Sequence, residues 1–266
     1  MSAARSIGSA LSSHAGRVDL RGLTVEVGPP HARVTAFDGL DLDIDAGQFV
    51  CVLGPSGCGK STLLAAVAGH LAASEGQIEV DGVRVDRPHP DRGLVFQQHT
   101  LFPWKRVVDN VAFGLKVRGV GAAERRREAR DLLELVGLDG YESHYPAQLS
   151  GGMQQRVEIA RVLINRPRVL LMDEPFAALD AQTRKKMQRL LLDVWSKVRT
   201  TVIFVTHDIE EALFLGERVV MLSRQPARIV ADIDVPFKRP RTDESTLDAA
   251  FVELKRRCLA LLREPA

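Results

Sequence analysis

One eight-residue segment constrains this chain more than any other feature of its sequence. Residues 54–61 read GPSGCGKS and match the pattern G-x-x-x-x-G-K-S. They directly follow the continuously apolar run 49–53 and directly precede the apolar segment 62–68. The run predicts a strand buried on both faces, as in a parallel sheet covered by helices, and the segment after the loop predicts a helix. Strand, glycine-rich loop and helix in this order predict a P-loop rather than an ordinary strand-to-helix turn.

A P-loop predicts a phosphate site because successive backbone N–H groups point inward and the helix start adds positive potential. In this reading Lys60 reaches the terminal phosphates and Ser61 offers a hydroxyl to Mg²⁺. We therefore expect a nucleoside triphosphate, with Mg²⁺, on the following residues: Gly54, Pro55, Ser56, Gly57, Cys58, Gly59, Lys60, Ser61 and Thr62.

The remaining apolar patterns predict an α/β fold. Segments 169–172 and 202–205 repeat the buried-strand pattern, and each precedes a helix-like stretch. Between 19 and 44 the apolar residues roughly alternate around a Gly-Pro-Pro turn, which predicts antiparallel strands, and another strand pair is expected at 219–222 and 228–233. The expected class is a P-loop core with a mixed sheet and helices, an antiparallel β subdomain and an inserted α-helical subdomain.

The expected boundaries follow from these patterns. Residues 1–17 are rich in Ser, Ala and Gly, lack the apolar centre of a secretory signal and are expected to form a flexible tail. A nucleotide-binding domain is predicted at 18–235, with a helical insert at about 98–152 that includes an amphipathic helix between 121 and 137. Residues 236–266 are predicted to form a short helical tail, with an apolar face of Leu247, Phe251, Leu254, Cys258 and Leu261, and no large regulatory domain is expected.

Composition excludes several classes of protein. The 36 Lys and Arg residues nearly cancel the 34 Asp and Glu residues, and a net charge of +2 argues against a dedicated nucleic-acid binder. No apolar stretch reaches the roughly 18 to 20 residues that span a bilayer, so the chain is not expected to cross a membrane by itself. The three cysteines, Cys51, Cys58 and Cys258, show neither a disulfide framework nor a zinc-binding spacing.

An acidic pair, Asp173 and Glu174, ends the buried segment that begins at 169. Such a pair could cap a following helix. Beside a P-loop, the stronger hypothesis is that Asp173 holds Mg²⁺ through water and Glu174 orients and deprotonates the attacking water.

A second helix start suited to anions lies at Leu149-Ser150-Gly151-Gly152, where Ser150 can serve as N-cap and the glycines allow a ligand to approach the backbone. One nucleotide scarcely needs two such sites some ninety residues apart. This motif points beyond a generic P-loop ATPase.

The order of the P-loop, a Gln after Phe96, an LSGG-type helix start, strand-Asp-Glu and strand-Thr-His-Asp resembles the nucleotide-binding subunit of ABC transporters over roughly 18–235. The resemblance implies that Gln97 senses Mg²⁺ and the attacking water. It further implies that His207 is the switch histidine that contacts the γ-phosphate and that Asp180 belongs to the D-loop. From the residues alone, Gln97 could also be a surface amide, and His207 could have only a local role beside a capping pair of Asp208 and Glu211.

The same resemblance implies a homodimer. Ser150, Gly151, Gly152 and Met153 look like the signature that completes the ATP site of a second copy. The predicted catalytic residues are then Glu174, His207 and Gln97, and the predicted Mg²⁺ contacts are Ser61, Gln97 and Asp173. Met153 replaces the usual Gln of the signature, with little expected effect because its backbone N–H is retained.

The segment after Gln97 suggests a partner. Leu101, Phe102 and Trp104 could be buried filler, or they could line a groove that receives a short cytoplasmic helix of a membrane permease. Residues 95–104, 109–115 and 206–212 and the Arg-Pro-Arg at 239–241 are similar to the taurine, alkanesulfonate and nitrate importer branch. The resemblance thus implies an ATP-hydrolysing importer subunit on the cytoplasmic face of the membrane, acting indirectly with an extracytoplasmic solute-binding protein. An importer subunit for another small solute, or a soluble ABC ATPase, is the alternative.

One position departs from the family. Members usually stack adenine on an aromatic residue before the P-loop, and Val27 stands there in this sequence. Phe37 lies too near the next predicted strand to substitute, and His31 is the other candidate ring. Losing a stacking contact of about 0.5–1.5 kcal/mol predicts ATP binding several-fold weaker than is usual for the family.

Overall fold

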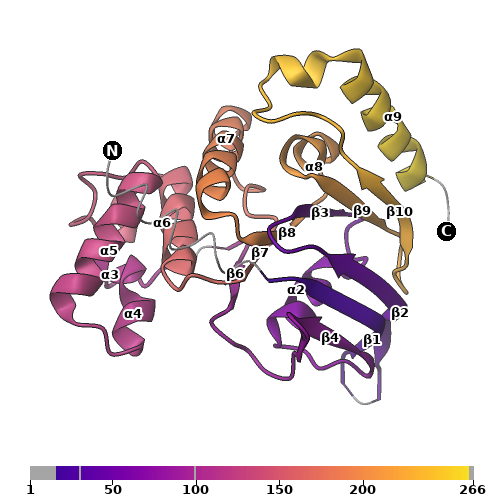
Figure 1. Ribbon diagram of the computed structural model, residues 1–266, viewed down its shortest axis with the longest axis horizontal. Coiled ribbons are helices and arrows are strands. Elements are labelled where there is room, and N and C mark those ends of the chain that lie inside the picture. Colours follow the sequence, from indigo (N-terminus) through magenta and orange to yellow (C-terminus); the bar gives the residue numbers. More distant parts are fainter. Residues whose placement is uncertain (1–15, 30, 99, 264–266) are drawn as a thin grey trace. The chain divides into compact units, whose positions relative to one another are not determined.

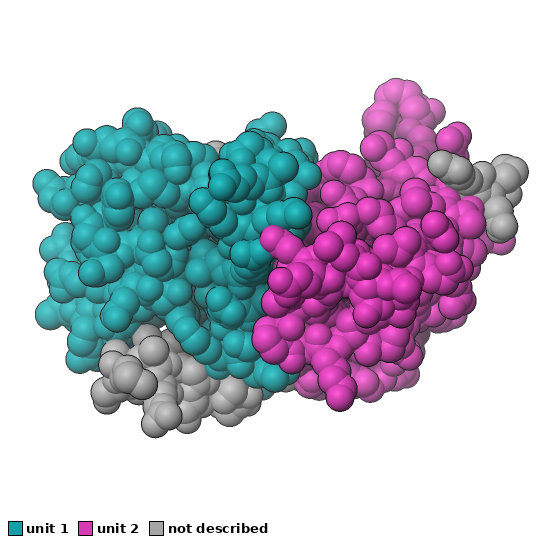
Figure 2. All heavy atoms as spheres, turned by 90° about the horizontal axis from the view of Figure 1, so that it is seen from above, with its two compact units in different colours: residues 1–15, 90–170, 175–200 teal, residues 16–89, 171–174, 201–266 magenta. Residues whose placement is uncertain are grey.

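The computed structural model describes residues 16–29, 31–98 and 100–263. The described residues belong to two compact units, which Figure 2 shows in different colours. Unit 1 comprises 90–98, 100–170 and 175–200, and unit 2 comprises 16–29, 31–89, 171–174 and 201–263. No helix among the described residues combines the length and the apolar character that spanning a bilayer requires.

Unit 2 contains an antiparallel sheet in the order β2-β1-β4-β5 (Figure 1). Its strands are β1 (Val18–Val27), β2 (Val34–Ile44), β4 (Glu75–Val80) and β5 (Val83–Arg84). The register pairs Val18 with Ile44 and Val27 with Val34, so β1 and β2 form the antiparallel pair that the alternating apolar pattern predicts. Strands β4 and β5 were not expected, since only Ile78 and Val80 of the six residues of β4 are buried.

The second sheet has the order β10-β9-β3-β8-β7-β6. Its strands are β3 (Phe49–Leu53), β6 (Arg92–Val95), β7 (Val169–Asp173), β8 (Thr201–Thr206), β9 (Arg218–Leu222) and β10 (Ile229–Asp234). Strand β3 pairs in parallel with both β8 and β9, and every residue of β3 is buried. Such burial on both faces explains the continuous apolar run before the P-loop. Strand β10 is antiparallel to β9, so the sheet is mixed, as predicted.

The helices of unit 2 are α2 (Lys60–Ala68), α8 (Ile209–Leu215) and α9 (Ala249–Arg263). Helix α9 buries Phe251 and Cys258, as its apolar spacing predicts. The prediction was wrong for Leu247, which is 78% exposed and lies in a 3₁₀ turn before the helix. Helix α9 begins later because the carboxylate of Asp248 accepts a hydrogen bond from the backbone N–H of Ala250.

Unit 1 carries the helices α3 (Val107–Val111), α4 (Phe113–Val117), α5 (Ala122–Leu135), α6 (Gly151–Leu163) and α7 (Ala181–Val198). Helix α5 is the predicted amphipathic helix and buries Ala129, Leu132 and Leu133. Described residues between 98 and 150 contain helices and a 3₁₀ turn but no strand. The expected limits of the insert, 98 and 152, remain predictions.

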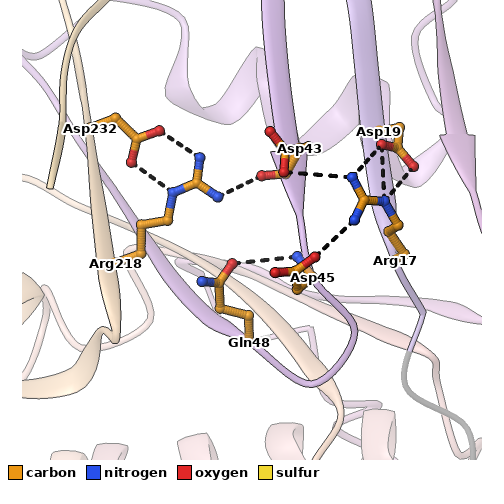
Figure 3. A network of polar contacts seen from close by, with 7 residues as sticks. All are labelled: Arg17, Asp19, Asp43, Asp45, Gln48, Arg218 and Asp232. Carbon is orange, nitrogen blue, oxygen red and sulfur yellow. Dashed lines mark hydrogen bonds and ion pairs between the residues drawn. The ribbon is translucent and has the colours of Figure 1, made fainter. Parts of the chain in front are cut away.

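A polar network within unit 2 links strand β2 to strands β9 and β10 (Figure 3). Arg17 bonds to Asp19 and Asp45, and Arg218 forms a fork with Asp232 while donating to the backbone oxygen of Asp43 at 2.6 Å. Residues 1–15 of the expected flexible tail lie outside the described residues. Arg17, which was assigned to that tail, is held by these ion pairs.

Candidate nucleotide-binding site

The P-loop lies in unit 2 between the buried strand β3 and helix α2. Gly57 and Gly59 have φ angles of 78° and 107°, in the left-handed region that favours glycine. A Cβ atom on Gly59 would also come within 3.1 Å of Cζ of the Phe37 ring. The glycine at position 59 is therefore required both by its backbone conformation and by the packing of the buried Phe37 beneath it.

The side chain of Lys60 is buried within this loop, with 5% of its surface exposed. Its ammonium donates to the backbone oxygens of Gly54 and Pro55, both at 2.9 Å, and lies 4.0 Å from Oε1 of Glu174. A buried cation is stable only with such partners. Two N–H donors of Lys60 are bonded to these loop carbonyls. Phosphate oxygens would replace the carbonyls as acceptors, so the loop fits a phosphate group.

Ser61 and Asp173 meet across this site. The hydroxyl of Ser61 donates to Oδ1 of Asp173 at 3.0 Å. Burial, together with the neighbouring charge of Glu174, raises the pKa of Asp173 above its usual range, although the hydrogen bond from Ser61 opposes this shift. One hydroxyl and one carboxylate suit Mg²⁺, which normally keeps several waters and binds phosphates as well.

Glu174 directly follows strand β7 and has an unusual backbone conformation. Its φ angle is 42°, a left-handed value that is uncommon for a residue with a side chain, and its N–H donates to the backbone oxygen of Val205. Its Oε2 lies 2.9 Å from Nδ1 of His207. The capping alternative for the acidic pair is wrong, because helix α7 begins only at Ala181 and its N-cap is Asp180.

His207 lies at the end of β8, in the loop before helix α8. Asp208 is the N-cap of α8 and accepts hydrogen bonds from the N–H groups of Glu210 and Glu211. The carboxylate of Glu211 instead accepts from the hydroxyl of Thr206 at 2.6 Å. The local capping role thus belongs to Asp208, while the exposed imidazole of His207 contacts Glu174. Unit 2 therefore brings together the P-loop, Asp173, Glu174 and His207.

The predicted signature and D-loop residues lie in unit 1. Ser150 is the N-cap of α6, as predicted, and accepts from the N–H of Met153 at 3.4 Å. Asp180 caps α7 and accepts from the N–H groups of Gln182 and Thr183, and hydrogen bonds, first of all with Thr183, lower its pKa. The helix starts that follow Ser150 and Asp180 lie in contact: a Cβ atom on Gly152, in α6, would come within 2.8 Å of the methyl group of Thr183, in α7. Gly151 is exposed, and a Cβ atom on it would come no nearer than 3.9 Å to the closest neighbour, a methyl group of Leu179.

Gln97 and the residues after it lie in the same unit. Gln97 is exposed in the segment that follows β6. The three apolar residues after Gln97 differ in exposure: Leu101 is buried and Phe102 half-buried, whereas Trp104 is 70% exposed. Burial fits the buried-filler hypothesis for Leu101, and exposure leaves Trp104 available to a partner.

Several residues that support this segment were missed in the sequence. The buried amide of Asn110 accepts from the N–H of Phe102 at 2.8 Å and donates to the backbone oxygens of Phe102 and Lys105. Glu158 and Arg161, on α6, bind the backbone of Thr100. A signal for Glu158 was present, because a carboxylate stands there inside the apolar run 157–160. Nothing in the local sequence indicated its partner, 58 residues away.

Val27 stands at the position expected for the adenine-stacking residue, and His31, the other candidate ring, is exposed in the turn before β2. Val27 is half-buried and pairs with the exposed Val34 at the end of the β1–β2 pair. Phe37 has no exposed surface and packs under Gly59, so its ring is not available to a ligand. The end of the β1–β2 pair thus presents the aliphatic side chains of Val27 and Val34 where a stacking ring was expected.

Comparisons with known proteins identify the family of this chain. Residues 37–177 match the family described as "ABC transporter". The chain covers all of a solved structure titled as a dimeric post-hydrolysis state of an ATP-binding cassette bound to ADP and Pi, which aligns over 83% of this chain with 33% identity and a TM-score of 0.73. This chain belongs to the ABC transporter family and has the α/β fold of its ATP-binding cassettes, which are ATPases.

Three curated relatives are similar over most of their length. The taurine import ATP-binding protein of Rhizobium johnstonii is 51% identical, covering 86% of this chain and 89% of that protein. The nitrate import ATP-binding protein of Synechococcus elongatus is 44% identical, with 88% and 86% covered. The aliphatic sulfonates import ATP-binding protein of Bacillus cereus is also 44% identical, with 85% and 88% covered.

Proposed function

We propose that this chain is the ATP-binding, ATP-hydrolysing subunit of an importer for a small anionic solute of the taurine, aliphatic sulfonate or nitrate class. The import names of its relatives support this assignment, because their similarity extends over most of both chains. The contact between Glu174 and His207 beside Lys60 supports ATP hydrolysis most directly. The solute itself does not touch this subunit, so its class is inferred from the relatives alone.

The proposed chemistry is transfer of a phosphoryl group to water. Residues 54–62 hold the phosphates through backbone N–H groups, and Lys60 exchanges its two carbonyl partners for phosphate oxygens. Ser61, Asp173 and Gln97 would hold Mg²⁺, which supplies charge neutralisation on the phosphates. Glu174 orients the attacking water and removes its proton. Its hydrogen bond with His207 fixes the carboxylate, and His207 contacts the γ-phosphate.

The proposed active form is a homodimer. Ser150, Gly151, Gly152 and Met153 of one copy complete the ATP site of the other, and Asp180 connects the two sites. The exposure of Gly151 and the N-terminus of helix α6 support this role, because an accessible helix start binds anions. Two nucleotides that invert a 99:1 ratio of open to closed dimers must together favour the closed form by about 5.5 kcal/mol.

The dimer is proposed to act on a membrane permease at the cytoplasmic face, with Gln97, Leu101, Phe102 and Trp104 nearest to the docking surface. An extracytoplasmic protein delivers the solute to that permease. In this scheme residues 18–235 are the nucleotide-binding domain, with the insert at 98–152, between a tail at 1–17 and a helical segment at 236–266. The exposed indole of Trp104 supports the docking surface.

The test is a Glu174→Gln variant. We expect it to bind ATP, to lose ATP turnover by at least about a hundredfold, as removal of a general base does, and to accumulate as a dimer in ATP. Light scattering after size exclusion measures the dimer, and Glu134→Gln, on the exposed face of α5, is the matched control. Monomeric elution of Glu174→Gln in saturating ATP would contradict the shared site.

A further inference from the structure

A buried carboxylate on helix α8 has no part in the chemistry described so far. Glu211 is only 6% exposed, although glutamate is almost never buried without a partner. The residues that follow it in the helix, Ala212 and Leu213, are buried as well. Its neighbour Glu210 is half-exposed instead and pairs with Lys255 at 2.6 Å. Burying a carboxylate is costly, so the position of Glu211 calls for a reason.

The carboxylate of Glu211 is bonded to the hydroxyl of Thr206, the last residue of strand β8. The hydroxyl donates to Oε2 of Glu211 at 2.6 Å, and both side chains are buried. The same oxygen of Thr206 accepts from the backbone N–H of Asp208 at 3.0 Å. A hydroxyl has one proton and an ionised carboxylate can only accept. The proton of Thr206 therefore points to Glu211, and a lone pair of the hydroxyl oxygen remains for the N–H of Asp208.

These two hydrogen bonds lie on either side of His207. Its imidazole is exposed, so little packing holds the ring, and its direction depends on the backbone at 206–208. The other partner of the ring is tied to the same strand, because the N–H of Glu174 donates to the backbone oxygen of Val205 at 3.1 Å. The contact of 2.9 Å between Nδ1 of His207 and Oε2 of Glu174 thus depends on how the end of β8 is held.

We propose that Glu211 is a positioning residue for ATP hydrolysis, which acts on His207 through the hydroxyl of Thr206. The proposal rests on the proposed function, because it presumes that His207 contacts the γ-phosphate and fixes Glu174. Groups that act on a reacting centre need supporting hydrogen bonds to keep their geometry. Glu211 would supply that support from a position where it touches neither nucleotide nor water.

The alternative is that Glu211 only stabilises helix α8. The structure gives that task to other residues at both ends of the helix. Asp208 caps its start through two backbone N–H groups, and Arg241 binds the backbone oxygens at its end. The carboxylate of Glu211 is therefore not required as a cap, and its bond to Thr206 is directed at the loop that carries His207.

The experiment compares steady-state ATPase activity of the full chain in Glu211→Leu, Glu211→Gln and Thr206→Val. Leucine nearly keeps the volume of glutamate and removes the acceptor, glutamine keeps an acceptor oxygen, and valine keeps the shape of threonine without its hydroxyl. The matched control is Glu210→Leu, the same change one residue away, at the carboxylate that pairs with Lys255. His207→Ala reports whether the histidine is needed.

We expect Glu211→Leu and Thr206→Val each to lower kcat about ten- to a hundredfold, as misplacement of a reacting group does. KM for ATP should stay within about twofold of wild type, because the P-loop is unchanged. The double variant should be no slower than either single one, since both remove the same hydrogen bond. Glu211→Gln should recover kcat to within about threefold of wild type, and Glu210→Leu should match wild type.

Nuclear magnetic resonance of the imidazole nitrogens measures the positioning itself. The signals of His207 are assigned by their loss in His207→Ala. We expect them to move in Glu211→Leu and Thr206→Val, and to stay in place in Glu210→Leu. A residue that merely stabilised α8 would leave the ring nitrogens of the folded protein unchanged.

Two results would overturn the proposal and spare the proposed function. One is wild-type kcat in Glu211→Leu, or in Thr206→Val should the first variant not fold. The other is an equal loss of kcat and of thermal stability in Glu211→Leu and Glu211→Gln, with the His207 signals unmoved, which would show a structural role only. Both leave the loss of activity in His207→Ala intact. Wild-type activity in His207→Ala would instead overturn the proposed role of the histidine, and this proposal with it.

Discussion

Glu158 holds the backbone of Thr100. Its carboxylate accepts from the N–H of Thr100 and, at 3.0 Å, from the hydroxyl of the same residue, although 58 residues separate the two in sequence. Arg161, one turn further along α6, donates to the backbone oxygen of Thr100 at 2.7 Å and lies 4.3 Å from the centre of the Phe102 ring. These contacts link helix α6, whose N-cap is Ser150, to the segment that leads to Trp104.

Replacing Glu158 should uncouple these two elements. Glu158→Leu removes charge-assisted hydrogen bonds worth about 1.5–3 kcal/mol each and leaves the Thr100 N–H unpaired. We expect ATP binding to persist and permease-stimulated ATPase to fall several-fold, with partial recovery in Glu158→Gln, which keeps an acceptor. Parallel assays of unstimulated and stimulated ATPase check this, with Glu134→Leu as control. An equal loss in both assays would show a structural role only.

The two signature glycines should differ when substituted. Gly151 has space for a side chain in this chain, whereas a Cβ atom on Gly152 would collide with Thr183. Gly151→Val should therefore keep the thermal stability of the wild type within about 2 °C but lose ATP-dependent dimerisation, because its side chain would enter the shared site. Gly152→Val should lose stability as well.

Differential scanning fluorimetry and light scattering in ATP separate these effects. Gly121→Val is the control for Gly151→Val, because Gly121 also has open space around it and lies at the N-cap of α5. Dimer formation by Gly151→Val at wild-type nucleotide concentrations would count against a site completed by a second copy.

A ring at position 27 should strengthen ATP binding. Val27→Tyr adds a stacking contact of about 0.5–1.5 kcal/mol, so ATP should bind about two- to tenfold more tightly. Equilibrium titration with a fluorescent ATP analogue, competed by ATP, measures the change. Val83→Tyr, at an exposed strand position in the same sheet, is the control, and identical ATP affinity in Val27→Tyr and wild type would refute the prediction.

Arg241 should be essential to the fold of the C-terminal region of unit 2. Its buried guanidinium donates to the backbone oxygens of Leu213, Phe214 and Gly216 at the end of helix α8. Burial, followed by the charge of Arg239, lowers its pKa to about 10, so it remains a cation at neutral pH. Arg241→Met leaves these carbonyls without a donor and should cost about 3–5 kcal/mol.

Such a loss corresponds to a fall of about 6–20 °C in Tm for a chain of this size. Thermal denaturation followed by circular dichroism measures it. Arg257→Met, an exposed change on α9, should leave Tm within about 2 °C, as surface changes usually do. A similar small shift for Arg241→Met would show that water replaces its hydrogen bonds.

The local sequence was sufficient to predict much of the fold and of the nucleotide site. The P-loop, the buried strands β3, β7 and β8 and the N-cap of α6 could be predicted because their signals lie within a few neighbouring residues. Strands β4 and β6 could not, since β4 is only partly buried and β6 has one buried residue. Leu247 was placed in a helix because spacing alone does not show that Asp248 starts that helix.

Only the tertiary structure decided which chemical groups meet. The hydrogen bond between Glu174 and His207 depends on β7 and β8 ending at the same edge of the sheet, with 33 residues between the two side chains. A pocket of unit 1 likewise collects cations from helices α4 and α5 and from the loop before α3, which carry no common sequence motif. A sequence records local conformational preferences, whereas these contacts arise because burying apolar faces brings distant segments together, and the polar groups that meet there must then satisfy one another.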